Sequence, residues 1–232
     1  YLRHKRTGLE VFHMLKDDKE NLFAFAFRTL AKDSKGTAHI MEHSVLCGSE
    51  KYPLKEPFTN LCNQSLKTFL NAMTYPDKTV YPASSLNKTD YFNLMDVYGD
   101  AVFFPLLSEN TFLQEGHRLE KNDDGTYSIQ GVVYNEMKGS YSSFSGASYR
   151  SVSRILQKGS CYGNSSGGDP FRNLHTVSSG NSMTSIILLQ TVCFSCTAIF
   201  LLKNSLILFR KKFLTVLKRN ILYLPCLQVF HT

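Results

Sequence analysis

Apolar and polar side chains alternate along the start of the chain with the period of a β-strand. Residues 8–16 place Leu9 and Val11 on the face opposite Glu10, and residues 21–28 form a more continuous apolar run that includes Phe27. Alternation predicts a half-buried strand, whereas the continuous run predicts a strand that is largely buried. Two more strands are predicted at 69–75 and 79–81, joined by a Pro-Asp-Lys turn at 76–78.

Five other segments have the pattern of helices. One is predicted from 36 to about 47, closed by Gly48, and a second over 58–68. A long amphipathic helix spans 87–104, with its apolar residues on one face. Residues 109–119 predict another helix, and 131–157 a mostly helical segment broken at Gly146. Strands and helices mix without a regular βαβ alternation, so the predicted fold class is α+β.

Charge divides the chain into two kinds of sequence. The formal net charge is +7, yet residues 1–169 carry equal numbers of acidic and basic side chains, and residues 170–232 contain no Asp or Glu. At ordinary acid content, such an acid-free stretch has a probability on the order of 0.0003. The excess positive charge therefore belongs to the tail, and we expect no nucleic-acid partner. Apolar content of 43% excludes collagen and wholesale disorder.

The cysteines indicate a reducing compartment. Of the six cysteines, only Cys47, Cys62 and Cys161 lie in the charge-balanced part, and their wide and irregular spacing is a poor disulfide framework. Cys193 and Cys196 form a C-x-x-C pair, but without a second pair two incidental cysteines are the favoured interpretation over redox or metal chemistry. Residues 1–6 contain no apolar stretch typical of a signal peptide, so we expect the protein not to be secreted.

The pattern His39-Ile40-Met41-Glu42-His43 carries the candidate chemistry. It is H-x-x-E-H, and on a helix positions i, i+3 and i+4 share one face. Both imidazoles can therefore converge on one metal ion with a carboxylate beside it. The intervening carboxylate is a candidate general base, which takes a proton as metal-bound water attacks a carbonyl.

Two alternatives stay open at this point. The histidines could be surface residues beside a helical glutamate, and the five-residue pattern arises by chance on the order of once in a hundred chains of this length. A catalytic zinc also needs a third protein ligand, which spacing does not identify. The candidates for that ligand are Glu50, Glu56, Glu115, Glu120 and Glu136.

Several longer motifs make the sequence similar to a known family. They are GTAHIMEHSVLCGSEKYPLKEPF at 36–58, SLKTFLNAMTYPDKTVYP at 65–82, LQEGHRLE at 113–120, GVVYNEMKG at 131–139 and SGGDP at 166–170. In this order they closely resemble the presequence-protease branch of the pitrilysin-type, inverzincin zinc metallopeptidases. The resemblance extends over residues 8–174 and implies a processing-peptidase-like domain, a mixed sheet with helices packed on it, here incomplete.

The resemblance assigns roles to individual residues. It implies His39 and His43 as ligands of one zinc ion, Glu42 as general base, and Glu136 as the third ligand. Such enzymes are metalloendopeptidases that degrade unstructured oligopeptides, including cleaved targeting sequences. The implied location is the mitochondrial matrix or plastid in a eukaryote, and the cytoplasm in a prokaryote.

The same resemblance implies where a peptide binds. Asn71 and Ala72 match an edge strand that holds the peptide backbone by β-augmentation. Leu46 and Phe58 match apolar positions near the pocket after the scissile bond, although ordinary core positions are an equal alternative. Glu115 could support the metal ligands, but a salt bridge on a helix surface is the favoured interpretation.

One departure from the family affects activity. Family members consist of two related halves that close around a chamber, and the second half supplies an Arg and a Tyr that stabilise the oxyanion. Residues 1–174 correspond to the N-terminal part of the first half, so the missing second half is the partner that this chain needs. An open site admits water to the reacting groups, and this weakens the electrostatic stabilisation of the transition state. We therefore expect this chain alone to be weak or inactive.

The tail resembles a membrane segment only superficially. Residues 185–202 are mostly apolar and are followed by basic residues, the minimal pattern of a transmembrane helix. However, shifting the reading frame by one base from codon 174 allows residues 174–200 to be read as LTYSQFRKFHDKYYSPSNCLFLLYGNI. That sequence matches the continuation of the resembling family after SGGDP, and it restores the missing acids.

We therefore interpret residues 175–232 as a frameshift product with no genuine membrane span, and expect them to take no part in the fold. Three functional hypotheses follow: a zinc endopeptidase, a non-catalytic homologue that binds peptides or partners, and a protein anchored through 185–202. The complete set of His39, Glu42, His43 and Glu136 favours the first.

Overall fold

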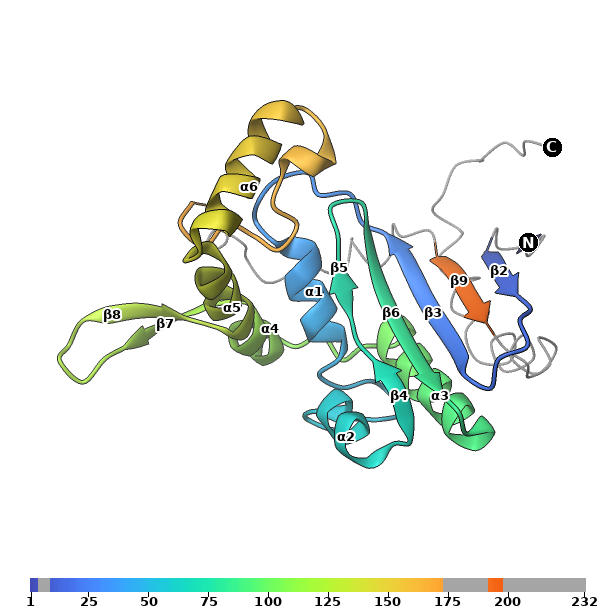
Figure 1. Ribbon diagram of the computed structural model, residues 1–232. Helices are drawn as coiled ribbons and strands as arrows, with labels where there is room; N and C mark the ends of the chain where they lie inside the picture. The colour runs from blue at the N-terminus through green and yellow to red at the C-terminus, as the bar shows by residue number, and fades with distance from the viewer. Residues whose placement is uncertain (4–8, 173–191, 198–232) are drawn as a thin grey trace, which may run out of the picture.

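The computed structural model describes residues 1–3, 9–172 and, as a backbone strand, 192–197 (Figure 1). Its main sheet has the strand order β1-β2-β9-β3-β6-β4, and β5 also pairs with β6. The strands are β1 (Leu2–Arg3), β2 (Glu10–Met14), β3 (Asn21–Arg28), β4 (Lys67–Leu70), β5 (Met73–Thr74), β6 (Lys78–Ser85) and β9 (Val192–Thr197). A separate hairpin of β7 (Arg118–Lys121) and β8 (Tyr127–Gln130) extends away from the sheet.

Helices gather mainly at the β4–β5 edge of this sheet, as Figure 1 shows. They are α1 (Thr37–Val45), α2 (Pro57–Gln64), α3 (Lys88–Phe103), α4 (Glu109–Glu115), α5 (Val132–Tyr141) and α6 (Phe144–Leu156), with a short 3-10 turn η1 (Cys161–Gly163). Three of them begin at side chains that accept hydrogen bonds from free backbone N–H groups: Asn87 for α3, Ser108 for α4 and Ser143 for α6.

The core lies where β3 and β6 meet α1 and α3. These two strands pair antiparallel over all eight residues of each. Alternation turns Phe23, Phe25 and Phe27 to one face, where Phe23 makes an edge contact with Tyr91 and Phe25 with Phe103. Helix α1 is covered on its inner side by this cluster, so its opposite side is free to form a pocket.

The α+β fold class is confirmed, and most predicted elements are present. Strand β3 has the predicted bounds, whereas β6 runs from 78 to 85 and is longer than the predicted 79–81. Helix α2 ends at Gln64, before the predicted end at 68, because β4 begins at Lys67. The predicted break in the last helical segment lies at Ser142–Ser143 rather than Gly146, since Ser143 caps α6 by accepting a hydrogen bond from Gly146 N–H.

The β7–β8 hairpin was missed by the sequence prediction, which extended a helix to residue 119. Helix α4 instead ends at Glu115. The Asp-Asp-Gly turn at 123–125 was predicted, and the backbone N–H of Asn122 bonds the carbonyl of Thr126 across it. The flanking strands contain Leu, Glu and Lys, which favour helices, so cross-strand pairing overrides local propensity here.

Strand β9 departs from the expectation that nothing after residue 174 joins the fold. Its backbone lies between β2, to which it is parallel, and β3, to which it is antiparallel. Without it, the facing edges of β2 and β3 would lack backbone partners, which is costly for buried strands. The rest of 175–232 lies outside the described residues, and the boundary at 174 stays a prediction. Within the described part of the chain, no helix is long and apolar enough to cross a membrane.

Candidate metal centre

Helix α1 presents the H-x-x-E-H side chains on one face. Gly36 directly precedes its first residue and has a φ of 72°, a left-handed conformation that favours glycine. His39 and Glu42 are buried and His43 is partly buried. One potential ligand atom from each of the three lies within 4.8 Å of the others. The helical spacing predicted from sequence therefore brings two imidazoles and a carboxylate together.

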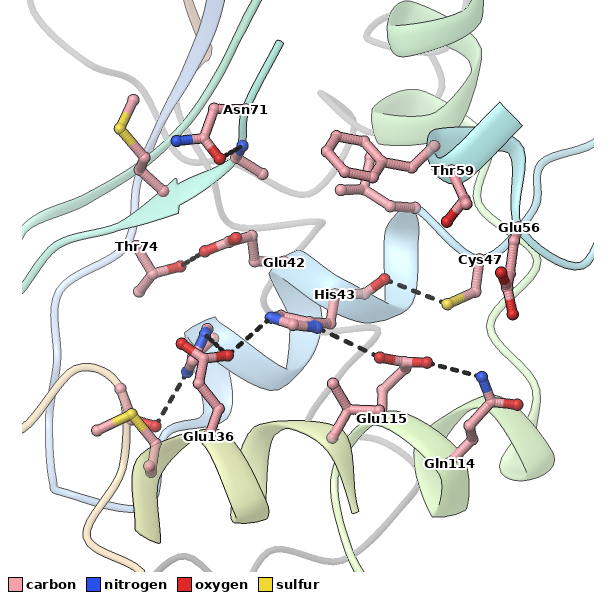
Figure 2. Close-up of a pocket in the computed structure, with 18 of the residues that line it drawn as sticks. Glu42, His43, Cys47, Glu56, Thr59, Asn71, Thr74, Gln114, Glu115 and Glu136 are labelled. Atoms are coloured by element: carbon pink, nitrogen blue, oxygen red, sulfur yellow. Dashed lines mark hydrogen bonds and ion pairs between the residues drawn. The ribbon is translucent and has the colours of Figure 1, made fainter. Parts of the chain in front are cut away.

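Glu136 approaches this group from helix α5 (Figure 2). Its Oε2 lies 3.6 Å from the Nε2 of His39 and 3.6 Å from the Nε2 of His43. The side chain of Glu136 is 54% exposed, whereas the side chain of His39 is 10% exposed. One carboxylate oxygen thus faces both ring atoms from the solvent side, which is the arrangement that three ligands of one cation require.

The second nitrogen of each ring has its own partner. His39 Nδ1 lies 3.1 Å from the carbonyl oxygen of Gly167, and His43 Nδ1 lies 3.2 Å from Oε2 of Glu115. A carbonyl or a carboxylate can only accept, so these contacts require the proton on Nδ1. Both Nε2 atoms are then available on the side of Glu136.

The structure corrects the expectation for Glu115. This residue is 7% exposed and therefore does not form a salt bridge on a helix surface. Its Oε2 faces His43, and its Oε1 accepts a hydrogen bond of 2.9 Å from the side-chain amide of Gln114. The interaction spans 72 residues of sequence, and no local pattern indicates it.

These contacts shift the pKa values of both partners. Burial alone would lower the pKa of His43, but the hydrogen bond to Glu115 and the negative charges of Glu42 and Glu136 outweigh it, so the pKa is raised. Burial would raise the pKa of Glu115, but the hydrogen bonds from His43 and Gln114 lower it. The raised pKa of His43 favours its protonated form, and the lowered pKa of Glu115 favours the ionised carboxylate beside it.

Glu42 is held by a residue that the sequence did not indicate. Thr74 Oγ1 donates a hydrogen bond of 2.6 Å to Glu42 Oε2, as Figure 2 shows. Thr74 is on β5, at the edge of the sheet, and its Oγ1 also lies 3.5 Å from the buried hydroxyl of Thr79. One oxygen of the Glu42 carboxylate therefore faces β5.

A pocket of about 750 Å³ opens over these groups. The four residues predicted to bind substrate all line it, namely Leu46, Phe58, Asn71 and Ala72. Asn71 and Ala72 lie in the break between β4 and β5, where Asn71 N–H still bonds the carbonyl of Pro82 in β6. Of the other third-ligand candidates, Glu56 and Glu115 line the pocket, whereas Glu120 pairs with Arg118 in the hairpin.

Cys47 also lines the pocket, and we expect its thiol to be unreactive. Burial, with the nearby charge of Glu115, raises the pKa of Cys47 to about 12. Because the thiolate is the nucleophile, alkylation by iodoacetamide at pH 8 should be at least ~100-fold slower in the folded chain than in denaturant. Mass spectrometry of the labelled peptide measures both rates, and equal rates would contradict the expectation.

Sequence and structure comparisons relate the chain to known proteins. Residues 28–125 match the family model "Insulinase (Peptidase family M16)". Presequence protease 1, chloroplastic/mitochondrial, of Arabidopsis thaliana is 52% identical over 171 residues, which cover 72% of this chain and 16% of the relative. Presequence protease, mitochondrial, of Schizosaccharomyces pombe is 45% identical over 173 residues, which cover 73% and 17%.

A bacterial protein and a solved structure extend the comparison. Protein HypA of Clostridium perfringens is 49% identical over 170 residues, which cover 72% of this chain and 18% of HypA. The crystal structure of pitrilysin superposes with a TM-score of 0.66 at 17% identity, covering 91% of this chain and 22% of pitrilysin. The predicted pitrilysin-like fold is thereby confirmed. The chain spans about a sixth of the length of these curated relatives.

Proposed function

The chain is a pitrilysin-type relative of the presequence proteases of peptidase family M16, and from that premise we propose that its pocket is the zinc site of an endopeptidase for unstructured peptides. The single observation that supports this most is the convergence of His39, His43 and Glu136, with Glu42 beside them. Two imidazoles and one carboxylate match a catalytic zinc site, which leaves a position open for substrate.

The ligand atoms fit a zinc ion chemically. His39 and His43 each have Nδ1 bound to an acceptor, so the Nε2 of each ring carries a lone pair toward the oxygen of Glu136. When bound, zinc supplies a Lewis acid that polarises a peptide carbonyl and makes water more acidic. The exposed position of Glu136 keeps one side of the site open to a substrate.

Glu42 is the general base in this proposal. Its carboxylate takes the proton from the attacking water and later donates it to the amine released when the C–N bond breaks. The hydrogen bond from Thr74 holds one oxygen, Oε2, so that Oε1 is free to take the proton. Glu42 is only 6% exposed, so little water surrounds its carboxylate. Hydrogen bonds in such surroundings are stronger than in bulk water.

The edge of the sheet provides the peptide-binding surface. We infer that an extended peptide pairs with the segment around Asn71 and Ala72. Such pairing uses backbone hydrogen bonds, so it does not depend on the side chains of the peptide. Such pairing requires a substrate without structure of its own. Leu46 and Phe58 form the apolar side of the pocket for the residue after the scissile bond. Among the described residues, the lining includes glutamates but no Lys or Arg, which favours cations and positively charged peptides.

The whole protein, rather than this chain alone, is the proposed enzyme. The matched segment covers only 16% and 17% of the two presequence proteases, and a closed chamber in the whole protein would exclude water from the pocket. We place the protein in mitochondria or plastids if it is eukaryotic, as the names of the Arabidopsis and Schizosaccharomyces relatives suggest, and in the cytoplasm if it is prokaryotic. A protein that binds peptides without cleaving them is the second candidate.

Peptide hydrolysis separates these two candidates. The chain, restored to its reading frame and continued to the length of the relatives, should cleave an unstructured peptide and spare a folded protein of similar size. A chelator should stop cleavage, and added zinc should restore it. Peptide binding without cleavage by the zinc-loaded protein would instead identify a non-catalytic binder.

A further inference from the structure

We propose that the loop at 164–169 is a positioning element for the metal site, acting through the backbone carbonyl of Gly167 on His39. This inference rests on the proposed zinc site and adds to it a role for the S-G-G-D stretch at 166–169, which lies far from the ligands in sequence. The contact from His39 Nδ1 to the carbonyl of Gly167 spans 128 residues. It fixes both the tautomer and the rotation of the ring.

The loop is itself fixed to the segment that precedes α1. Asn164 Nδ2 donates to the carbonyl of Ala31, Ser165 N–H donates to the hydroxyl of Ser34, and Asp169 N–H donates to the carbonyl of Ser34. The three distances are 2.9, 3.0 and 2.8 Å. Both ends of the loop are therefore bound to residues 31–34, just before the helix that carries His39.

Gly167 also contacts the helix that carries the third ligand. A Cβ atom placed on Gly167 would lie 2.7 Å from Sδ of Met137 and 3.7 Å from Nδ1 of His39. Met137 directly follows Glu136 on α5. The glycine thus fits between α1 and α5, and its small size lets the two ligand-bearing helices approach each other. The neighbouring Gly168 has a φ of 100°, a left-handed turn that favours glycine and aims the preceding carbonyl.

The two histidine rings therefore have hydrogen-bond acceptors of different charge at Nδ1. The ring of His43 is held by a carboxylate, whereas the ring of His39 is held by a neutral carbonyl. A neutral acceptor orients the ring without adding charge to a site that already contains several glutamates. Without that acceptor, the ring of His39 should rotate freely. Zinc binding would then have to restrict this rotation, which should lower the affinity.

Zinc affinity of the full 232-residue chain tests the proposal without turnover. Gly167→Ala should displace the loop against Met137, and Ser34→Ala removes an acceptor that anchors it. Competition with a chromophoric chelator should show zinc binding weakened about 10- to 100-fold in both variants. Ser34→Thr, which keeps the hydroxyl, should restore the affinity. Gly139→Ala is the matched control, since a Cβ there meets open space on the same helix α5 as Glu136.

A spectroscopic measurement separates positioning from general destabilisation. In the zinc-loaded chain, the Nδ1–H proton of His39 should exchange slowly with water, and in Gly167→Ala and Ser34→Ala it should exchange faster. Affinities within twofold of the unchanged chain, with an unaltered His39 proton, in Ser34→Ala and in any folded Gly167→Ala protein would overturn the proposal. If the unchanged chain bound no zinc, the proposed function itself would fail instead.

Discussion

Replacing Glu42 by Gln is expected to lower peptide hydrolysis by about 100- to 10,000-fold while zinc stays bound, the usual range for loss of a general base. Glutamine keeps the shape of the side chain and can still accept the hydrogen bond from Thr74. It has no basic oxygen for the proton of the attacking water. The metal ligands lie on other residues, so metal binding should not change.

The measurement uses the chain restored to its reading frame and continued to the length of its relatives, so that hydrolysis can be followed. Zinc content and cleavage are measured on the same preparation. Glu50→Gln is the control, because Glu50 is exposed and does not line the pocket. If Glu42→Gln lost the metal and Glu136→Gln kept it, the two roles would be reversed.

Restoring the reading frame by one base at codon 174 should raise the free energy of unfolding, by about 2–5 kcal/mol for the strand at 192–197 alone. The restored frame places Cys-Leu-Phe-Leu-Leu-Tyr at the six positions that form β9, where the present chain has Val-Cys-Phe-Ser-Cys-Thr. The restored frame has leucine in place of Cys193, Ser195 and Cys196, and each leucine that becomes buried contributes about 1.5–3 kcal/mol. Phenylalanine occupies position 194 in both frames, opposite Val11 of β2 and Phe25 of β3.

Denaturant unfolding of the two proteins measures this difference. A control restored only after codon 197 keeps the present β9 sequence and should gain less stability. Equal free energies of unfolding for all three proteins would contradict the frameshift interpretation. Sequencing the coding DNA across codons 165–180 is an independent check, and a transcript without a missing base would also contradict it.

The metal-binding pattern could be predicted from sequence because its members are neighbours on one helix. The i, i+3 and i+4 spacing of His39, Glu42 and His43 needs only the helical period, and α1 has that period. Glu136 was one of five candidates until the V-Y-N-E-M-K-G motif distinguished it. Its position beside both Nε2 atoms depends on the packing of α5 against α1.

The supporting contacts could not be predicted because they join distant segments. Thr74 reaches Glu42 across 32 residues, Glu115 reaches His43 across 72, and Gly167 reaches His39 across 128. Spacing alone assigns none of these pairs. The motifs that contain Thr74, Glu115 and Gly167 were recognisable as stretches, but a motif does not state which atom its residues contact. Strand β9 was not predicted because residues 175–232 were interpreted as a frameshift product, and its partners in β2 and β3 lie 165 to 183 positions earlier.

Zinc content of the folded chain is the most direct test of the proposed site. The purified protein is loaded with zinc, passed over a desalting column and analysed for metal and protein on the same sample. We expect about one zinc per chain, and we expect His39→Ala and His43→Ala, each still folded, to retain none. A folded, unchanged chain that retained no zinc, or variants that retained as much as the unchanged chain, would contradict the assignment of His39, His43 and Glu136 as its ligands.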